Sequence, residues 1–153
     1  MRPGTTDPDA DEAEHAFATA LAFQVASTRA SETKIVDDKF QRALVPAVVC
    51  AALSVELGMK ARIIADGNRA RYKALKGTSG HSLATLFPLL SEDDRNWFID
   101  GSGLQADDFM ETLRSVSNAF IDWRYVYEKS ERDINFSFLS KLSQLASTLP
   151  AEL

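Results

Sequence analysis

Apolar residues recur along this chain at steps of three and four, the spacing that lines one face of an α-helix. Residues 13–30 carry Phe17, Leu21 and Val25 at steps of four. Residues 44–66 carry two neighbouring apolar rows, wide enough for a central helix, with Pro46 near the start and a capping Gly67 just beyond the end. The rows are Val48, Ala52, Val55, Met59 and Ile63, and Val49, Leu53 and Leu57.

The second half of the chain continues the helical pattern. Residues 81–90 predict a short helix that Pro88 kinks or shortens, and Ser91 is the expected N-cap of a helix stopping at Gly101 or Gly103. A second long helix is predicted over 106–129, with Phe109, Leu113, Val116, Phe120, Trp123 and Tyr127 as its stripe, and a last one carries Phe138, Leu142, Leu145 and Leu149. No stretch shows convincing β alternation. We expect an all-α, up-and-down bundle: two long antiparallel helices, at 44–66 and 106–129, with three or four shorter helices around them.

Length and composition favour one domain. The chain has 153 residues, 45% of them hydrophobic, enough for one buried core. Residues 1–11, rich in Pro, Gly, Thr and Asp, predict a disordered leader, with a cap to the first helix as the alternative, which leaves 12–150 as a single helical domain. No signal-peptide core and no apolar run of about 18 residues is evident, so we expect a cytoplasmic protein without a membrane span. Cys50 lies in an apolar run and is expected in the core.

Charge is unevenly distributed along the chain. The formal net charge is −5, yet residues 60–76 hold six bases and one acid, against 11 bases and 21 acids elsewhere. With Tyr72 among them, these bases predict a site for the phosphates of RNA or a nucleotide; the alternatives are a solvated loop or a docking face for an acidic partner. The candidate phosphate-binding residues are Arg62, Arg69, Arg71, Lys73 and Lys76.

Three segments, in this order, resemble the HEPN family of helical bundles. They are Glu56-Leu57-Gly58-Met59-Lys60, then Gly80-His81-Ser82-Leu83 followed by Leu86-Phe87, and Trp123-Arg124-Tyr125-Val126-Tyr127-Glu128. The resemblance spans residues 40–149. It implies a dimer with a composite cleft and, in many members, metal-independent ribonuclease activity attributed to an Arg followed four to six residues later by a His.

That catalytic motif is broken in this chain. Arg124 stands at the corresponding place, but residues 125–131 contain no histidine. The nearest arginine before His81 is Arg71, with an expected loop between them. The resemblance therefore implies the fold more directly than the chemistry, and we expect no standard HEPN ribonuclease catalysis.

Four polar residues are the remaining site candidates. Glu56 and Lys60 lie at i, i+4 and predict a structural ion pair, with a functional carboxylate as the alternative. His81 is either a general base or a helix-end residue. Arg124 either binds an anion or pairs with Glu128. Two distant histidines and one cysteine give no metal-ligand cluster, so we expect neither metal nor cofactor.

Two functions remain open. The first is RNA or nucleotide binding by a homodimer in a defence, toxin-antitoxin or RNA-processing context, with Arg124 and His81 as the catalytic residues if there is non-standard nuclease activity. The second is a catalytically silent helical module that dimerises or docks on a partner protein.

Overall fold

The protein is a helical bundle, as the sequence predicts. A computed structural model describes residues 7–75, 80–124 and 134–148, with Arg124 described by its backbone alone. Its α-helices are α1 (Pro8–Ser31), α2 (Leu44–Ala65), α3 (Arg69–Lys73), α4 (Leu83–Leu86), α5 (Glu92–Ser102), α6 (Ala106–Val116), α7 (Ala119–Arg124) and α8 (Phe136–Ser147). A 3-10 turn, η2 (Phe87–Leu89), follows α4, and two strands, β1 (Lys34–Val36) and β2 (Lys39–Gln41), lie between α1 and α2.

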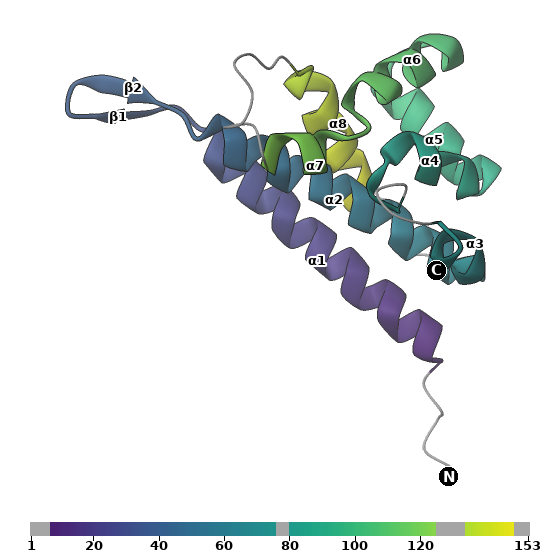
Figure 1. Ribbon diagram of the computed structural model, residues 1–153. Coiled ribbons are helices and arrows are strands. Elements are labelled where there is room, and N and C mark those ends of the chain that lie inside the picture. Colours follow the sequence, from purple (N-terminus) through teal and green to yellow (C-terminus); the bar gives the residue numbers. More distant parts are fainter. Residues whose placement is uncertain (1–6, 76–79, 125–133, 149–153) are drawn as a thin grey trace.

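Helix α2 is the centre of the bundle, as its two apolar rows predict. Helix α1 runs along one side of it, and the later helices gather on the other side (Figure 1). At its end Gly67 has φ +79° and donates its N–H to the carbonyl of Ile64, while Asn68 donates to Ile63 at 2.9 Å. This paired bonding stops the helix at the predicted glycine.

Helix α2 also corrects the expectation that no segment is long and apolar enough to cross a membrane. An 18-residue window within it has a mean hydropathy of 1.6. Of that window, 56% is buried inside the bundle, and a buried core helix meets the same criterion. Among the residues that the structure describes, this is the one such helix.

The two long antiparallel helices are α1 and α2, and not the helices at 44–66 and 106–129 as predicted, although α7 within the latter range does pack against α2. The α1 residues buried against α2 have small side chains. They are Ala13, Ala20 and Ser27, spaced seven residues apart. Ser27 Oγ donates to the carbonyl of Ala47 at 2.7 Å, and Ser54 Oγ on α2 donates to that of Ala20 at 2.8 Å. Small side chains let the backbones approach closely enough for these bonds.

The predicted apolar stripe of α1 is therefore not its buried face. Leu21 and Val25 are 45% and 37% exposed, whereas Phe17 packs at the edge of the core. The large side chains stood out in the sequence, but the close approach to α2 selects the small ones.

The predicted helix over 106–129 is broken after Val116. Ser117 and Asn118 separate α6 from α7, and the carbonyl of Ser117 accepts the N–H of Leu83 at 3.1 Å. The hydroxyl of Ser117 accepts the N–H of Ala84 and donates to the carbonyl of Leu113. The break thus supplies acceptors to the first turn of α4. The stripe itself is largely buried, at Phe109, Leu113, Val116 and Trp123; Tyr127 lies outside the described residues.

Strands β1 and β2 form an antiparallel hairpin that the sequence did not predict. It projects from the end of the bundle where α1 leads into α2 (Figure 1). Asp37 and Asp38, its two loop residues, have φ of +51° and +61°. Positive φ at both positions is the mark of a type I′ turn, which matches the twist of the strands. Three-residue strands are too short to show alternation.

The N-terminal helix begins earlier than the predicted leader allows. Pro8 takes the first helical position, where its missing N–H costs nothing, and the Asp7 side chain accepts the N–H of Asp9 at 3.0 Å. Residues 8–11, expected to be disordered, therefore form the first turn of α1. The first six residues of the predicted leader lie outside the described part of the chain.

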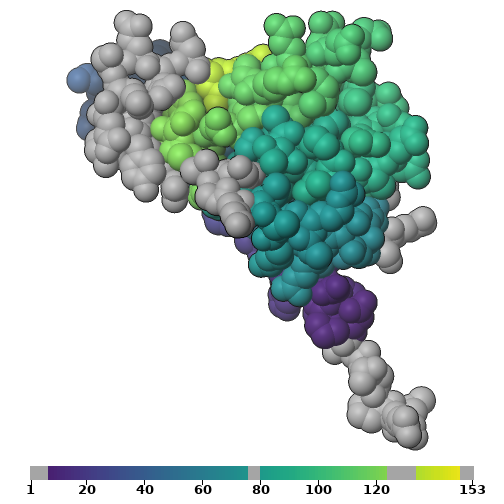
Figure 2. Space-filling model, turned by 45° about the vertical axis from the view of Figure 1, so that its right-hand side comes forward, coloured from purple at the N-terminus to yellow at the C-terminus, as the bar shows by residue number. Residues whose placement is uncertain are grey.

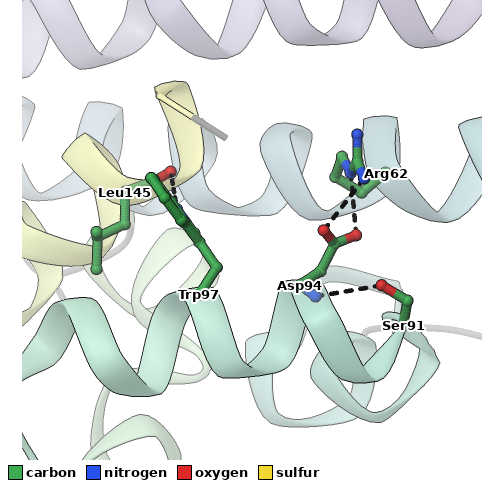
Figure 3. Close-up of polar contacts among 5 residues, drawn as sticks. All are labelled: Arg62, Ser91, Asp94, Trp97 and Leu145. Atoms are coloured by element: carbon green, nitrogen blue, oxygen red, sulfur yellow. Dashed lines mark hydrogen bonds and ion pairs between the residues drawn. The ribbon is translucent and has the colours of Figure 1, made fainter. Parts of the chain in front are cut away.

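Helices α4 and α5 follow the sequence closely. Pro88 confines α4 to a single turn followed by η2, and Leu83, Leu86, Phe87 and Leu90 are all buried as predicted. Ser91 caps α5 by accepting the N–H of Asp94 at 3.2 Å (Figure 3). Gly103, with φ +75°, ends it. Trp97 Nε1 donates to the carbonyl of Leu145 at 3.0 Å, which ties α5 to α8 (Figure 3).

Candidate functional site

A buried carboxylate on the central helix joins two predicted site residues. Glu56 is only 2% exposed. Its Oε1 lies 2.7 Å from Nδ1 of His81, and its Oε2 accepts from Nζ of Lys60 at 3.3 Å. The i, i+4 pair expected from the sequence is present, and a histidine 25 residues away completes a three-membered cluster. We call these three residues, together with the Tyr72 ring beside Lys60 and with Lys73 beside that ring, the Glu56 cluster.

The hydrogen bond to Glu56 defines the chemistry of the His81 ring. When Glu56 is ionised its Oε1 can only accept, so in a neutral imidazole Nδ1 carries the hydrogen and Nε2 is the nitrogen that can accept one. The ring packs on Phe120 of α7, with centroids 5.4 Å apart. Because the His81 side chain is 41% exposed while Glu56 is buried, the pair presents an oriented imidazole at the surface.

The Tyr72 ring extends this cluster onto α3. Nζ of Lys60 lies 5.7 Å from the ring centroid, and Nζ of Lys73 lies 5.2 Å from it. Two ammonium groups therefore share one aromatic ring, an arrangement favoured by the ring quadrupole. In the space-filling view, the teal surface around α3 lies above the first turns of α1 (Figure 2). Lys73 and Arg71 are exposed there.

The predicted phosphate-binding residues divide into structural and exposed bases. Arg62 bonds both oxygens of the Asp94 carboxylate, at 2.9 Å through Nε and 3.2 Å through one terminal nitrogen (Figure 3). These two side chains are only 11% and 6% exposed, so Arg62 joins α2 to α5 below the surface. Arg71 and Lys73 remain on the surface, and Lys76 lies outside the described residues.

Arg69 anchors α3 to the N-terminal helix. Its guanidinium lies 3.2 Å from a carboxylate oxygen of Asp9 and 2.6 Å from one of Glu12. All three side chains are more than one third exposed, so solvent screens the pairs. Three of the six bases that made residues 60–76 basic in sequence, Lys60, Arg62 and Arg69, are therefore paired with acids from outside that segment.

Arg124 and His81 come from neighbouring elements. Phe120, which contacts the His81 ring, precedes Arg124 by one turn of α7. The side chain of Arg124, and all of Glu128, lie outside the described residues. The backbone thus brings α7 alongside His81, and the contact between the two catalytic candidates stays a prediction.

Two acidic groups have raised pKa values because of their surroundings. Desolvation raises the pKa of Asp66, at the end of α2, above its ordinary value of 3.8; Arg62 lowers it and Asp94 raises it further. Burial likewise raises the pKa of the Cys50 thiol, which favours the protonated, unreactive form. Neither group is thereby prepared for chemistry.

The cluster can bind an anion and accept a proton at Nε2 of His81. Within the described ranges, no three His, Cys, Asp or Glu side chains are grouped as a metal site. The sequence suggested Glu56, Lys60 and His81 separately, but gave no sign that one carboxylate binds the other two. It gave no sign of the Arg62–Asp94 pair either, because 32 residues separate its members.

No protein-family model, curated protein or solved structure matches this chain. The resemblance to HEPN proteins therefore rests on the three short segments in the sequence. Two of those segments supply Glu56, Lys60 and His81, the residues that meet in the structure.

Proposed function

We propose that the protein is a HEPN-like domain that binds RNA or a nucleotide at the Glu56 cluster, without standard HEPN ribonuclease catalysis. One observation carries the proposal: Lys60 and Lys73 flank the ring of Tyr72 on the surface that also presents His81. Ammonium groups attract phosphate oxygens, and an aromatic ring offers a stacking surface for a base. The ammonium groups and the ring together match a ligand that carries both a phosphate and a base.

The exposed bases support the same proposal. Arg71 and Lys73 on α3 remain on the surface after Arg62 and Arg69 are taken up by carboxylates. The phosphate-binding set that we propose is therefore Arg71 and Lys73, with Lys76 retained from the sequence. Lys60, which is bound to Glu56, adds its charge beside the Tyr72 ring. The set is smaller than the sequence-based set and lies around one aromatic ring.

The absence of a histidine in residues 125–131 supports a role without standard catalysis. If the protein cleaves RNA, we expect His81 to be the general base, because its Nδ1 contact with Glu56 leaves Nε2 of a neutral ring to accept a proton. An RNA cleavage assay on the wild type, His81→Ala and Arg124→Ala addresses this directly. Cleavage that survives both substitutions would remove these two residues from any catalytic role.

The binding proposal is tested by fluorescence anisotropy with a labelled single-stranded RNA and a labelled adenine nucleotide over a series of salt concentrations. We expect Arg71→Glu/Lys73→Glu to weaken RNA binding by about tenfold or more and to reduce the slope of log affinity against log salt by roughly one. Tyr72→Ala should weaken binding with little change in the slope, because it removes stacking rather than charge.

The matched control is Arg114→Glu/Lys141→Glu, which makes the same change in net charge at two exposed positions away from α3. It should bind RNA nearly as well as the wild type. Equal loss in both double variants would show that only overall charge matters. A wild type that binds neither RNA nor nucleotide at low salt would contradict the proposal.

The second candidate is a protein-interaction module. The observation that favours it is a set of large exposed apolar side chains on and beside the hairpin: Ile35, Val36, Phe40, Leu44 and Val45. Clustered exposed apolar residues are typical of association surfaces.

A further inference from the structure

The hairpin exposes an apolar pair on one of its faces. Ile35 of β1 and Phe40 of β2 lie opposite each other in the register, so their side chains are on the same face. They are 70% and 80% exposed, the highest values among the large apolar residues that the structure describes. A two-stranded hairpin is marginally stable alone in water and gains stability from further strands. The hairpin is therefore incomplete as a sheet.

The outer edges of the hairpin are arranged for further pairing. In a two-residue hairpin the pair flanking the turn, here Val36 and Lys39, is the hydrogen-bonded one. The next pair, Ile35 and Phe40, is then non-hydrogen-bonded, and its backbone N–H and C=O groups point outward to the two edges. Each edge thus offers one residue with both backbone groups available to another strand.

We propose that two copies of this chain associate through β2, antiparallel and centred on Phe40, to form a four-stranded sheet. Phe40 of each copy exchanges both backbone hydrogen bonds with Phe40 of the other. The side chains of Ile35, Phe40, Phe40 and Ile35 then form one continuous row across the sheet. Each apolar pair, exposed in a single chain, gains a neighbour of its own kind.

Charge selects the β2 edge over the β1 edge. Antiparallel pairing centred on Phe40 sets Asp38 of one copy level with Arg42 of the other, and Lys39 level with Gln41, so the arrangement contains two opposite-charge pairs. The same operation centred on Ile35 of β1 sets Glu32 level with Asp38, acid against acid. Like charges directly opposite are destabilising, so a second copy fits β2 and not β1.

Sedimentation equilibrium on the full chain over a wide range of concentrations tests the proposal. We expect a monomer–dimer equilibrium that Phe40→Lys weakens by about tenfold or more, because an interface aromatic at the symmetry axis is lost. The control is Leu21→Lys, which places the same charge at another exposed apolar position, on α1. It should dimerise like the wild type. Circular dichroism checks that both variants are folded.

A charge exchange gives the sharper result. Arg42→Glu and Asp38→Lys should each dimerise more weakly than the wild type, since each sets like charges level across the axis. An equimolar mixture of the two should recover dimers, because both pairs then carry opposite charges. A wild type that stays monomeric throughout would overturn the proposal. A dimer unaffected by Phe40→Lys, or a mixture no tighter than its components, would overturn it as well.

Discussion

Removing the Asp94 carboxylate should be among the most damaging single changes to this fold. Asp94 lies in the first turn of α5 and accepts two bonds from Arg62 of α2 (Figure 3). The arginine side chain is only 11% exposed. A guanidinium cannot lose its proton in the accessible pH range, so Asp94→Ala removes the carboxylate that bonds two nitrogens of a positive charge held in a largely dry position.

The magnitude follows from that burial. Removing one partner of a buried ion pair costs about 3–5 kcal/mol, whereas an exposed pair contributes at most about 1 kcal/mol. For a chain of this size, a loss of about 3 kcal/mol lowers the melting temperature by about 6 °C or more. We expect a loss at the lower end of this range, because both side chains keep some contact with solvent.

Urea unfolding of Asp94→Ala, compared with Asp93→Ala, isolates the ion pair. Both residues are in the acidic first turn of α5, so both lose the same favourable interaction with the helix N-terminus, but Asp93 is exposed. Asp93→Ala should cost less than about 1 kcal/mol. Arg62→Met/Asp94→Leu should be more stable than Asp94→Ala, because it leaves no buried charge. Equal midpoints for Asp94→Ala and Asp93→Ala would refute the reasoning.

Two further predictions concern α2. In Gly58→Ala the new Cβ would lie 2.8 Å from the Ala146 Cβ. Although alanine is the better helix former, we expect this variant to lose about 1–2 kcal/mol of unfolding free energy, measured with urea. Gly80→Ala is the control and should lose none, because no atom lies within 4 Å of its new Cβ. A Gly58→Ala variant as stable as the wild type would contradict this packing. The pKa of Asp66 is raised in the folded protein, so the contribution of Asp66 to the free energy of unfolding falls as the pH rises above 3.8. Asp66→Asn should therefore exceed the wild type in stability at pH 7 but not at pH 3; a difference independent of pH would count against the shift.

The local signals in the sequence were reliable where a single residue type controls the backbone. Gly67 and Gly103 end helices because they adopt positive φ, and Ser91 begins one because its hydroxyl accepts a free N–H. Pro88 shortens α4 because proline cannot continue an α-helix. Such effects act over one turn and need no partner.

The candidate site was only partly predictable for the opposite reason. Glu56, Lys60 and His81 were each identified from the sequence, but that one buried carboxylate binds both others depends on how α2 meets the segment before α4. In the same way, Arg62 was expected to bind phosphate, but in the folded chain it forms an ion pair with Asp94. A sum of charges along the chain cannot reveal which bases are taken up by acids that are distant in sequence.

The sequence by itself determined that the chain is helical, where α2 lies and where most helices end, because periodicity and capping are local properties of the residues. Tertiary structure decided which helices pair, since the contact of α1 with α2 depends on small residues that allow close approach. It also decided that Ser117 interrupts a continuous apolar stripe, because its hydroxyl and carbonyl bond the first turn of α4. These outcomes depend on contacts between distant segments, and only the folded chain brings those segments together.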